Sequence, residues 1–223
     1  MCLLLLQIKK SRTGSLEPRE EMLAFATALV MCMLHPTSGV SSSLREFAAA
    51  WSKIQAYTAT LVMHETVGTS VQDRTYDCSF TKPHAATIVI SGGPGKGGRE
   101  VWTGGDTVIA SPPGLLSRLR LHLSIRDARV VTLRGDTIAM ASFAWLLQHL
   151  REKVQLSQSP GPSIGGNATT QLSLTVADAT RNGGITREVV DFSTATRLPV
   201  RVLRFVGSTL VKQIDFRNVK VQR

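Results

Sequence analysis

The sequence predicts an α+β fold in which helices cover the concave face of a strongly curved antiparallel sheet, an open half-barrel of about ten strands. The first observation is the block Ile185–Val221, where apolar residues alternate with Arg, Lys, Thr and Asp and breaks fall at 193–199 and 207–208. The second is a series of similar short segments between residues 57 and 110. The third is a stretch with helical spacing before each of these regions. Two amphipathic helices packed on two meanders can enclose a hydrophobic hollow.

The first helix is expected to begin at Ser43, because Ser43 and Glu46 have the spacing of a capping box. Apolar residues then recur at helical intervals through Ile54. Short alternating runs separated by turn residues predict strands at 57–65, 71–82, 86–90, 99–103 and 106–110. The glycine-rich residues 91–98 are expected to form a hairpin loop, and residues 111–127 fit either a helical turn or a strand.

A second helix is predicted after Ser142, its expected N-cap. Apolar residues follow at helical spacing: Phe143, Leu146, Leu147, Leu150 and Val154. Residues 157–169 are rich in Ser, Pro and Gly and predict a flexible polar loop. Strands resume at Gln171 and continue into the closing meander.

The N-terminal part predicts export. The stretch Met22–Leu34 is apolar and small polar residues follow it, so residues 1–42 are assigned to an export segment. Met22 is an alternative start, because three glutamates accompany the basic residues before it. The apolar stretch is shorter than the roughly 20 residues of a membrane span. A cleaved signal is therefore favoured over an uncleaved anchor or lipid attachment at Cys32, and the expected location is periplasmic, with a membrane-tethered form as the alternative.

Residues 43–223 are expected to form a single domain. From Ser41 onward the chain has 22 Lys and Arg against 13 Asp and Glu, a net charge of +9. The basic residues are scattered singly, which argues against nucleic acid and fits anionic lipid headgroups or envelope surfaces. Cys78 is the only cysteine of this part, so we expect no internal disulfide and a buried, unreactive thiol.

No motif in the sequence supports catalysis, a metal or a cofactor. Gly95-Lys96 is followed by Gly97, where a phosphate-binding loop needs Ser or Thr. His64-Glu65 has no second histidine at metalloprotease spacing, and no nucleophile elbow is present. These observations favour a protein that binds rather than reacts. The alternative enzyme is an envelope hydrolase that assembles Ser or His from distant strands.

Several patterns resemble the periplasmic lipoprotein carriers and outer-membrane lipoprotein-sorting proteins, the LolA-like family. The resemblance covers about residues 44–221 and rests on WSKIQAYTATLVMHE, the strand ending FTKP, EVWTGGDTVIASP, and the closing LPVRVLRF and LVKQIDFRNVKV. It implies an open half-barrel whose concave face, under helices, holds lipid acyl chains. It also implies a candidate cavity lining: Trp51, Tyr57, Leu61, Met63, Phe80, Trp102, Phe143 and Leu146. The alternative is that these side chains are plain core.

Two charged residues are candidates for the rim of this cavity. Alternation places Lys82 on the strand face of Tyr76 and Phe80. The resemblance matches Lys82 to an arginine that helps to close the lid in the carriers, and lysine cannot make the same bidentate bonds. Glu65 ends the face that carries Leu61 and is expected either to cap a hydrogen-bond network or to be solvated.

The function expected from these observations is that of a non-catalytic, monomeric carrier or binder of lipid acyl chains or lipoproteins. It would act in envelope lipoprotein sorting, and its partners would include sorting components at the inner or outer membrane. A protein-binding or sensor module of the same fold is the alternative. An exposed apolar groove without a deep cavity would favour that second function.

Overall fold

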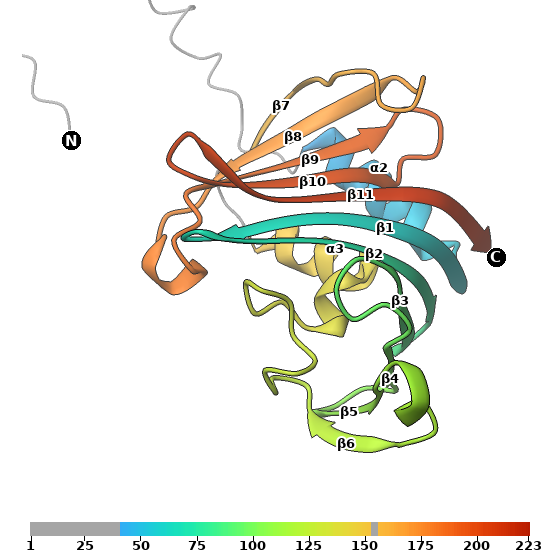
Figure 1. The fold of residues 1–223 in the computed structure, drawn as a ribbon. Helices are drawn as coiled ribbons and strands as arrows, with labels where there is room; N and C mark the ends of the chain where they lie inside the picture. Colours follow the sequence, from blue (N-terminus) through green and yellow to red (C-terminus); the bar gives the residue numbers. More distant parts are fainter. Residues whose placement is uncertain (1–40, 153–155) are drawn as a thin grey trace, which may run out of the picture. The chain divides into compact units, whose positions relative to one another are not determined.

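The computed structural model describes residues 41–152 and 156–223, and these residues form one compact unit (Figure 1). The expected export signal, the alternative start at Met22 and the attachment at Cys32 all lie outside the described residues, as does Val154. Of the assigned export segment only residues 41 and 42 are described, and Ser42 already belongs to the first helix. In the described part, no helix is both long and apolar enough to cross a bilayer.

Eleven antiparallel strands form one open sheet with the order β6-β5-β4-β3-β2-β1-β11-β10-β9-β8-β7. The first meander consists of β1 (Ala56–Val67), β2 (Ser70–Thr81), β3 (Ala85–Gly92), β4 (Arg99–Trp102), β5 (Thr107–Ser111) and β6 (Leu121–Ser124). The second consists of β7 (Leu156–Pro160), β8 (Thr169–Thr175), β9 (Arg187–Ser193), β10 (Pro199–Val206) and β11 (Thr209–Gln222). The two meet where β1 pairs with β11. The predicted α+β fold, an open curved sheet with two helices, is confirmed.

The two α-helices, α2 (Ser42–Ser52) and α3 (Phe143–Arg151), lie on the same side of the sheet (Figure 1). Alternation along β1 buries every second side chain toward them, from Tyr57 to Glu65. Aromatic rings from both helices and from four strands fill the space between: Phe47, Trp51, Tyr57, Phe80, Phe143, Phe192 and Phe216. This ring cluster fixes the helices on the sheet, since buried aromatic area is a large apolar contribution.

The helix starts differ in how well the sequence predicted them. Ser142 caps α3 as expected, because its side chain accepts a hydrogen bond from the backbone N–H of Trp145 at 3.1 Å. The capping box at Ser43 is wrong. The N-cap of α2 is Ser41, and the N–H of Ser43 donates to the side-chain oxygen of Gln158 at 3.0 Å.

Three connecting regions agree with the predicted structure to different degrees. The expected hairpin loop connects β3 to β4 but is shorter than predicted: it spans residues 93–98, because 91 and 92 still belong to β3. The ambiguous residues 111–127 contain both alternatives, a 3₁₀ turn at Gly114–Leu116 (η1) and then strand β6. The expected polar loop 157–169 is partly a strand, because Leu156–Pro160 pairs with β8 as the edge of the sheet.

Candidate ligand-binding site

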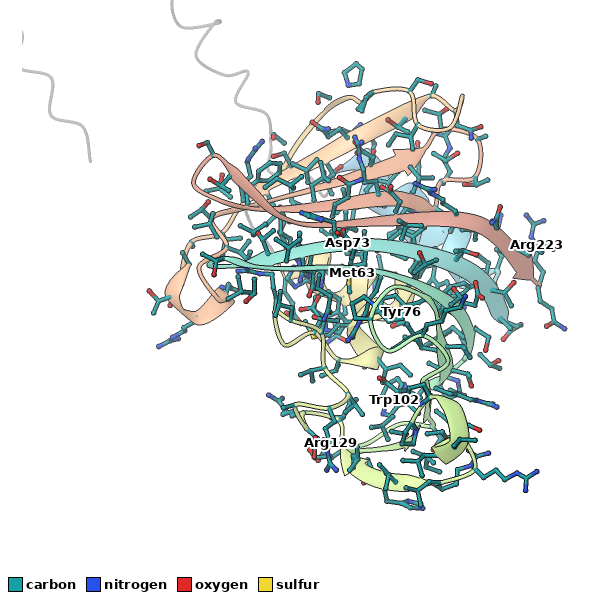
Figure 2. All side chains as sticks on the ribbon, in the orientation of Figure 1. Met63, Asp73, Tyr76, Trp102, Arg129 and Arg223 are labelled. Atoms are coloured by element: carbon teal, nitrogen blue, oxygen red, sulfur yellow. The ribbon has the colours of Figure 1, made fainter. Side chains whose placement is uncertain are left out.

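A small, mostly apolar cavity of about 50 Å³ lies between the sheet and residues 125–142, here called the cover segment. The cover segment connects β6 to α3 and contains only one short 3₁₀ helix, Ile138–Ala141 (η2). Strands β1, β2, β3, β4 and β11 form the opposite wall, and Figure 2 shows Met63 and Tyr76 on two of these neighbouring strands. Most of the lining is aliphatic: Leu61, Met63, Ile88 and Ile214 from the sheet, and Val130, Val131, Ile138 and Met140 from the cover segment.

Four polar side chains interrupt the apolar sheet wall of the cavity: Arg74 and Tyr76 from β2, Glu100 from β4 and Lys212 from β11. Tyr76 is only 8% exposed. By distance and angle, neither its hydroxyl nor the Nε of Arg74 has a hydrogen-bond partner among the described residues, although Arg74 lies close enough to lower in part the pKa of Tyr76, which burial raises. A buried polar group without a partner costs about 1–3 kcal/mol. A ligand that supplies a hydrogen-bond partner for these two groups would remove that cost.

Burial also changes the protonation of these groups. It raises the pKa of Glu100 to about 7, against the opposing effect of the Arg74 charge. Burial likewise raises the pKa of Tyr76, while Arg74 lowers it in part. The cavity wall near β2 and β4 therefore presents two hydrogen-bond donors and a carboxyl group that exchanges its proton near neutral pH.

A chain of buried charges closes one end of the cavity. Lys212 on β11 is fully buried and contacts both Glu65 on β1 and Asp136 of the cover segment, the latter at 2.6 Å. Arg204 on β10 continues the chain, with 2.9 Å to Asp136 and 2.5 Å to a second carboxylate, Glu188 on β9. His149 on α3 ends it at 2.5 Å from Glu188. This ion chain joins four strands, the cover segment and α3.

Two carboxylates of the ion chain, Asp136 and Glu188, have lowered pKa values. Burial alone would raise the pKa of Asp136, but Arg204 and Lys212 outweigh it and hold the pKa below its ordinary value. The pKa of Glu188 is lowered in the same way, because His149 and Arg204 outweigh its burial. Each buried charge thus has an opposite charge in direct contact, as buried ions require.

Arg134 holds the cover segment at a second place. Its guanidinium donates to the carbonyl of Thr66 at 2.6 Å and to that of Gly183 at 2.7 Å. Its backbone N–H donates to the carboxylate of Glu65 at 3.3 Å. Beyond these contacts lies a wider, more polar surface cleft of about 510 Å³, which shares Asp136 and Met140 with the cavity. The cover segment therefore stands between the apolar cavity and this cleft.

The eight expected lining residues occupy different places. Leu61 and Met63 line the cavity. Trp51, Tyr57, Phe80 and Phe143 pack against one another, with 4.4 Å between the ring centres of Tyr57 and Phe143. Leu146 is buried in the same core, whereas Trp102 is half-buried and donates to the carbonyl of Gly105 at 2.9 Å. The ligand-binding role of this set stays a prediction.

The two expected rim residues both contact other elements. Lys82 donates to the carbonyl of Trp51 at 2.7 Å, in the last turn of α2, and lies 4.3 Å from the centre of the indole ring. Desolvation lowers its pKa. Glu65 is fully buried and belongs to the ion chain, so it is not a solvated strand end. Lys82 thus ties α2 to β2, and Glu65 ties β1 to β11.

The sequence patterns did not lead us to Arg74, Glu100 or Lys212, although a signal existed for Arg74 and Lys212. Arg74 lies on the same strand face as Tyr76 on β2, and Lys212 lies on the same face as Phe216 on β11. The alternation that pointed Lys82 inward therefore points these cations inward as well.

Cys78 is buried, and burial raises the pKa of its thiol to about 12. In the described ranges, no three His, Cys, Asp or Glu side chains gather as a metal-binding group.

No protein-family model and no curated protein matches the sequence. Among solved structures, an outer membrane lipoprotein-sorting protein domain from Vibrio parahaemolyticus is similar at 12% identity, covering 80% of this chain and 92% of its own, with a TM-score of 0.40. A LolA superfamily protein from Nitrosomonas europaea is similar at 10% identity over 82% and 95% of the two chains, with a TM-score of 0.37. LprF from Mycobacterium bovis is similar at 12% identity over 79% and 90%, with a TM-score of 0.49.

LolA-like and lipoprotein-sorting proteins are thus among the structures similar to this chain, as the resemblance in the sequence led us to expect. At these identities and TM-scores the similarity does not extend to what is bound. The cavity and its side chains carry the functional argument.

Proposed function

We propose that this protein is a non-catalytic, exported binder of acyl chains, carried by lipids or lipoproteins, that acts in envelope lipoprotein sorting in the periplasm. The observation that carries the proposal is the aliphatic cavity between the sheet and the cover segment. The transfer of an acyl chain from water to such walls is favourable by about 0.8 kcal/mol for each buried methylene. A site with few polar groups in an apolar wall is the usual form of a small-molecule site.

Binding of a long acyl chain would require the cover segment to move. A single water needs about 10–15 Å³ by this measure, so 50 Å³ holds about four groups of that size, fewer than a long acyl chain. The cover segment has little secondary structure and is held through Asp136 and Arg134 at identifiable contacts. It is therefore the part of the wall that can withdraw while the sheet stays intact.

The aromatic cluster gives the site room to extend. Trp51, Tyr57, Phe80 and Phe143 would line the same hollow once α3 shifts away from the sheet with the cover segment, to which it is directly joined. Lys82 would remain at the edge of the hollow, because it holds the end of α2 on β2. In such an open state, the aromatic residues would line the ligand site and Lys82 would lie at its rim, as the sequence predicted.

The test is to export the full chain in a bacterium, purify it without detergent, and examine it by native mass spectrometry and solvent extraction. We expect a stoichiometric acyl-bearing ligand. Ala141→Trp places a bulky ring in the cavity and should reduce occupancy severalfold, whereas Ala49→Trp, on the exposed face of α2, should not. Thermal unfolding separates lost occupancy from lost folding, and Val131→Phe serves as a milder filling variant.

An empty protein that also takes up no added lipid would overturn the proposal. In that outcome the cavity is part of an ordinary core. The protein-binding or sensor function would then lead, and sorting components at either membrane would be sought as partners rather than as recipients of cargo.

A further inference from the structure

Resting on the proposed function, the geometry points to a specific headgroup: we propose that Arg74 and Tyr76 bind the carboxylate of a fatty acid whose chain lies in the apolar cavity. Both side chains project from β2 to the same face, two residues apart. Both carry a buried donor, Nε–H and O–H, that has no partner among the described residues. An acceptor placed between them would satisfy both donors, and the charge of Arg74 favours an anionic one.

The surroundings favour a carboxylate over a phosphate. Arg74 forms no ion pair in this wall, although its charge acts on Glu100, whereas Lys212 already contacts Glu65 and Asp136. One arginine and one hydroxyl match the single charge and two oxygens of a carboxylate. A phosphate group would bring up to two charges into an aliphatic space that offers one cation without an ion-pair partner.

Glu100 makes the binding depend on pH. The charged and titratable groups that line the same cavity as Glu100 are Arg74 and Tyr76 from β2, Asp136 from the cover segment and Lys212 from β11. When protonated, Glu100 can donate a third hydrogen bond to the ligand; when ionised, it repels the ligand carboxylate. Because its pKa is raised to about 7, affinity for a carboxylate should fall as the pH rises through that value.

The test compares myristic acid with methyl myristate, at submicellar concentration, by titration calorimetry on the delipidated full chain. We expect the acid to bind about tenfold more tightly at pH 6, and Tyr76→Phe or Arg74→Gln to remove that preference while leaving the ester unchanged. Arg217→Gln is the matched control, since Arg217 is exposed and pairs with Asp215 on the surface. The acid preference should weaken from pH 6 to pH 8 in the wild type but not in Glu100→Gln.

The outcomes separate this inference from the function on which it rests. Equal affinity for acid and ester, or an acid preference that survives both substitutions, overturns the carboxylate subsite and leaves acyl binding standing. Binding of neither compound contradicts the proposed function itself.

A second inference concerns the outer edge of the first meander. Residues 113–120, here called the leucine loop, connect β5 to β6 and include η1, and every one of them is exposed. Leu115 is fully exposed, Leu116 is 61% exposed and Leu119 is 47% exposed. Three large aliphatic side chains on one short loop form a patch of the kind that marks a contact surface.

The charges around the leucine loop indicate which type of surface it would contact. Arg118 and Arg120 lie within it, and Arg99 and His122 line an adjoining recess of about 320 Å³ together with Arg120. No Asp or Glu occurs between residues 107 and 126. Arg120 also braces the loop, because it donates to the hydroxyl of Ser111 at 2.5 Å. Exposed leucines beside unopposed arginines match a bilayer with anionic headgroups.

We infer that the leucine loop docks the protein on an anionic phospholipid surface, with the leucines below the headgroups and the arginines among them. The test is co-sedimentation of the full chain with vesicles of phosphatidylcholine containing 30% phosphatidylglycerol, compared with phosphatidylcholine alone. We expect binding to the anionic vesicles, reduced at least tenfold in Leu115→Ser/Leu116→Ser/Leu119→Ser and severalfold by 0.5 M salt.

The matched control is Val71→Ser/Val206→Ser/Val221→Ser, which removes exposed aliphatic side chains elsewhere. It should bind as the wild type does. Unchanged binding by the leucine variant, or equal loss in the control, overturns the assignment of the loop. Equal binding to both vesicle types overturns the role of the anionic headgroups.

Discussion

At the scale of the residue, Lys212 has the most demanding environment in the site. Its amine is fully buried between Glu65 and Asp136. Replacing one partner of a buried ion pair leaves an uncompensated charge, so we expect Lys212→Met to reduce the free energy of unfolding by about 3–5 kcal/mol. Urea denaturation followed by circular dichroism measures it.

The comparison that isolates the charge is the double variant Glu65→Leu/Lys212→Met, which removes both ions and should recover much of the loss. Lys220→Met, on the exposed part of the same strand, should change stability little. A single variant within 1 kcal/mol of the wild type would contradict the view that Lys212 compensates the buried carboxylates.

How far the sequence predicts the site depends on where each residue lies. Glu65 and Lys82 could be placed because each continues a regular strand, and the same rule reaches Lys212 and Arg74. The position of Asp136 could not be predicted, because it lies in the cover segment, which lacks the regular apolar spacing of a helix or strand. Pairing Asp136 with Lys212 requires knowing the fold first, so the ion chain is a tertiary feature without a local signal.

At the scale of the element, the start of α2 and strand β7 were both missed, and the two contact each other. The side chain of Gln158, on β7, contacts Ser41 at 2.5 Å, Ser42 at 3.0 Å and the N–H of Ser43 at 3.0 Å. A distant strand thus supplies the capping group that the sequence suggested would come from Ser43 itself. Because β7 is a polar edge strand, it lacks the alternation that identified β1, β2 and β9 to β11.

At the scale of the whole molecule, the two meanders form one sheet through a pairing that no local pattern predicts. Strand β1 pairs with β11, so that Leu61 faces Phe216 across the junction. The ion chain crosses the same junction, with Glu65 and Asp136 from the first meander and its connection, and Lys212, Arg204 and Glu188 from the second. The sequence predicts each meander, while their union depends on contacts between residues far apart in the chain.

This arrangement predicts that the molecule reassembles from two fragments divided between α3 and β7, such as 41–154 and 155–223. Separately, each fragment leaves apolar faces and one side of its junction strand, β1 or β11, uncovered, so neither should unfold cooperatively. Mixed in equal amounts, they should regain a single cooperative thermal transition, measured by circular dichroism. A second fragment that carries Lys212→Met should reassemble much more weakly, because Glu65 would be buried without its cation, whereas one with Lys220→Met should behave as the unmodified fragment does. Cooperative unfolding of either fragment alone would show that the junction is a contact between independent domains rather than the centre of one sheet.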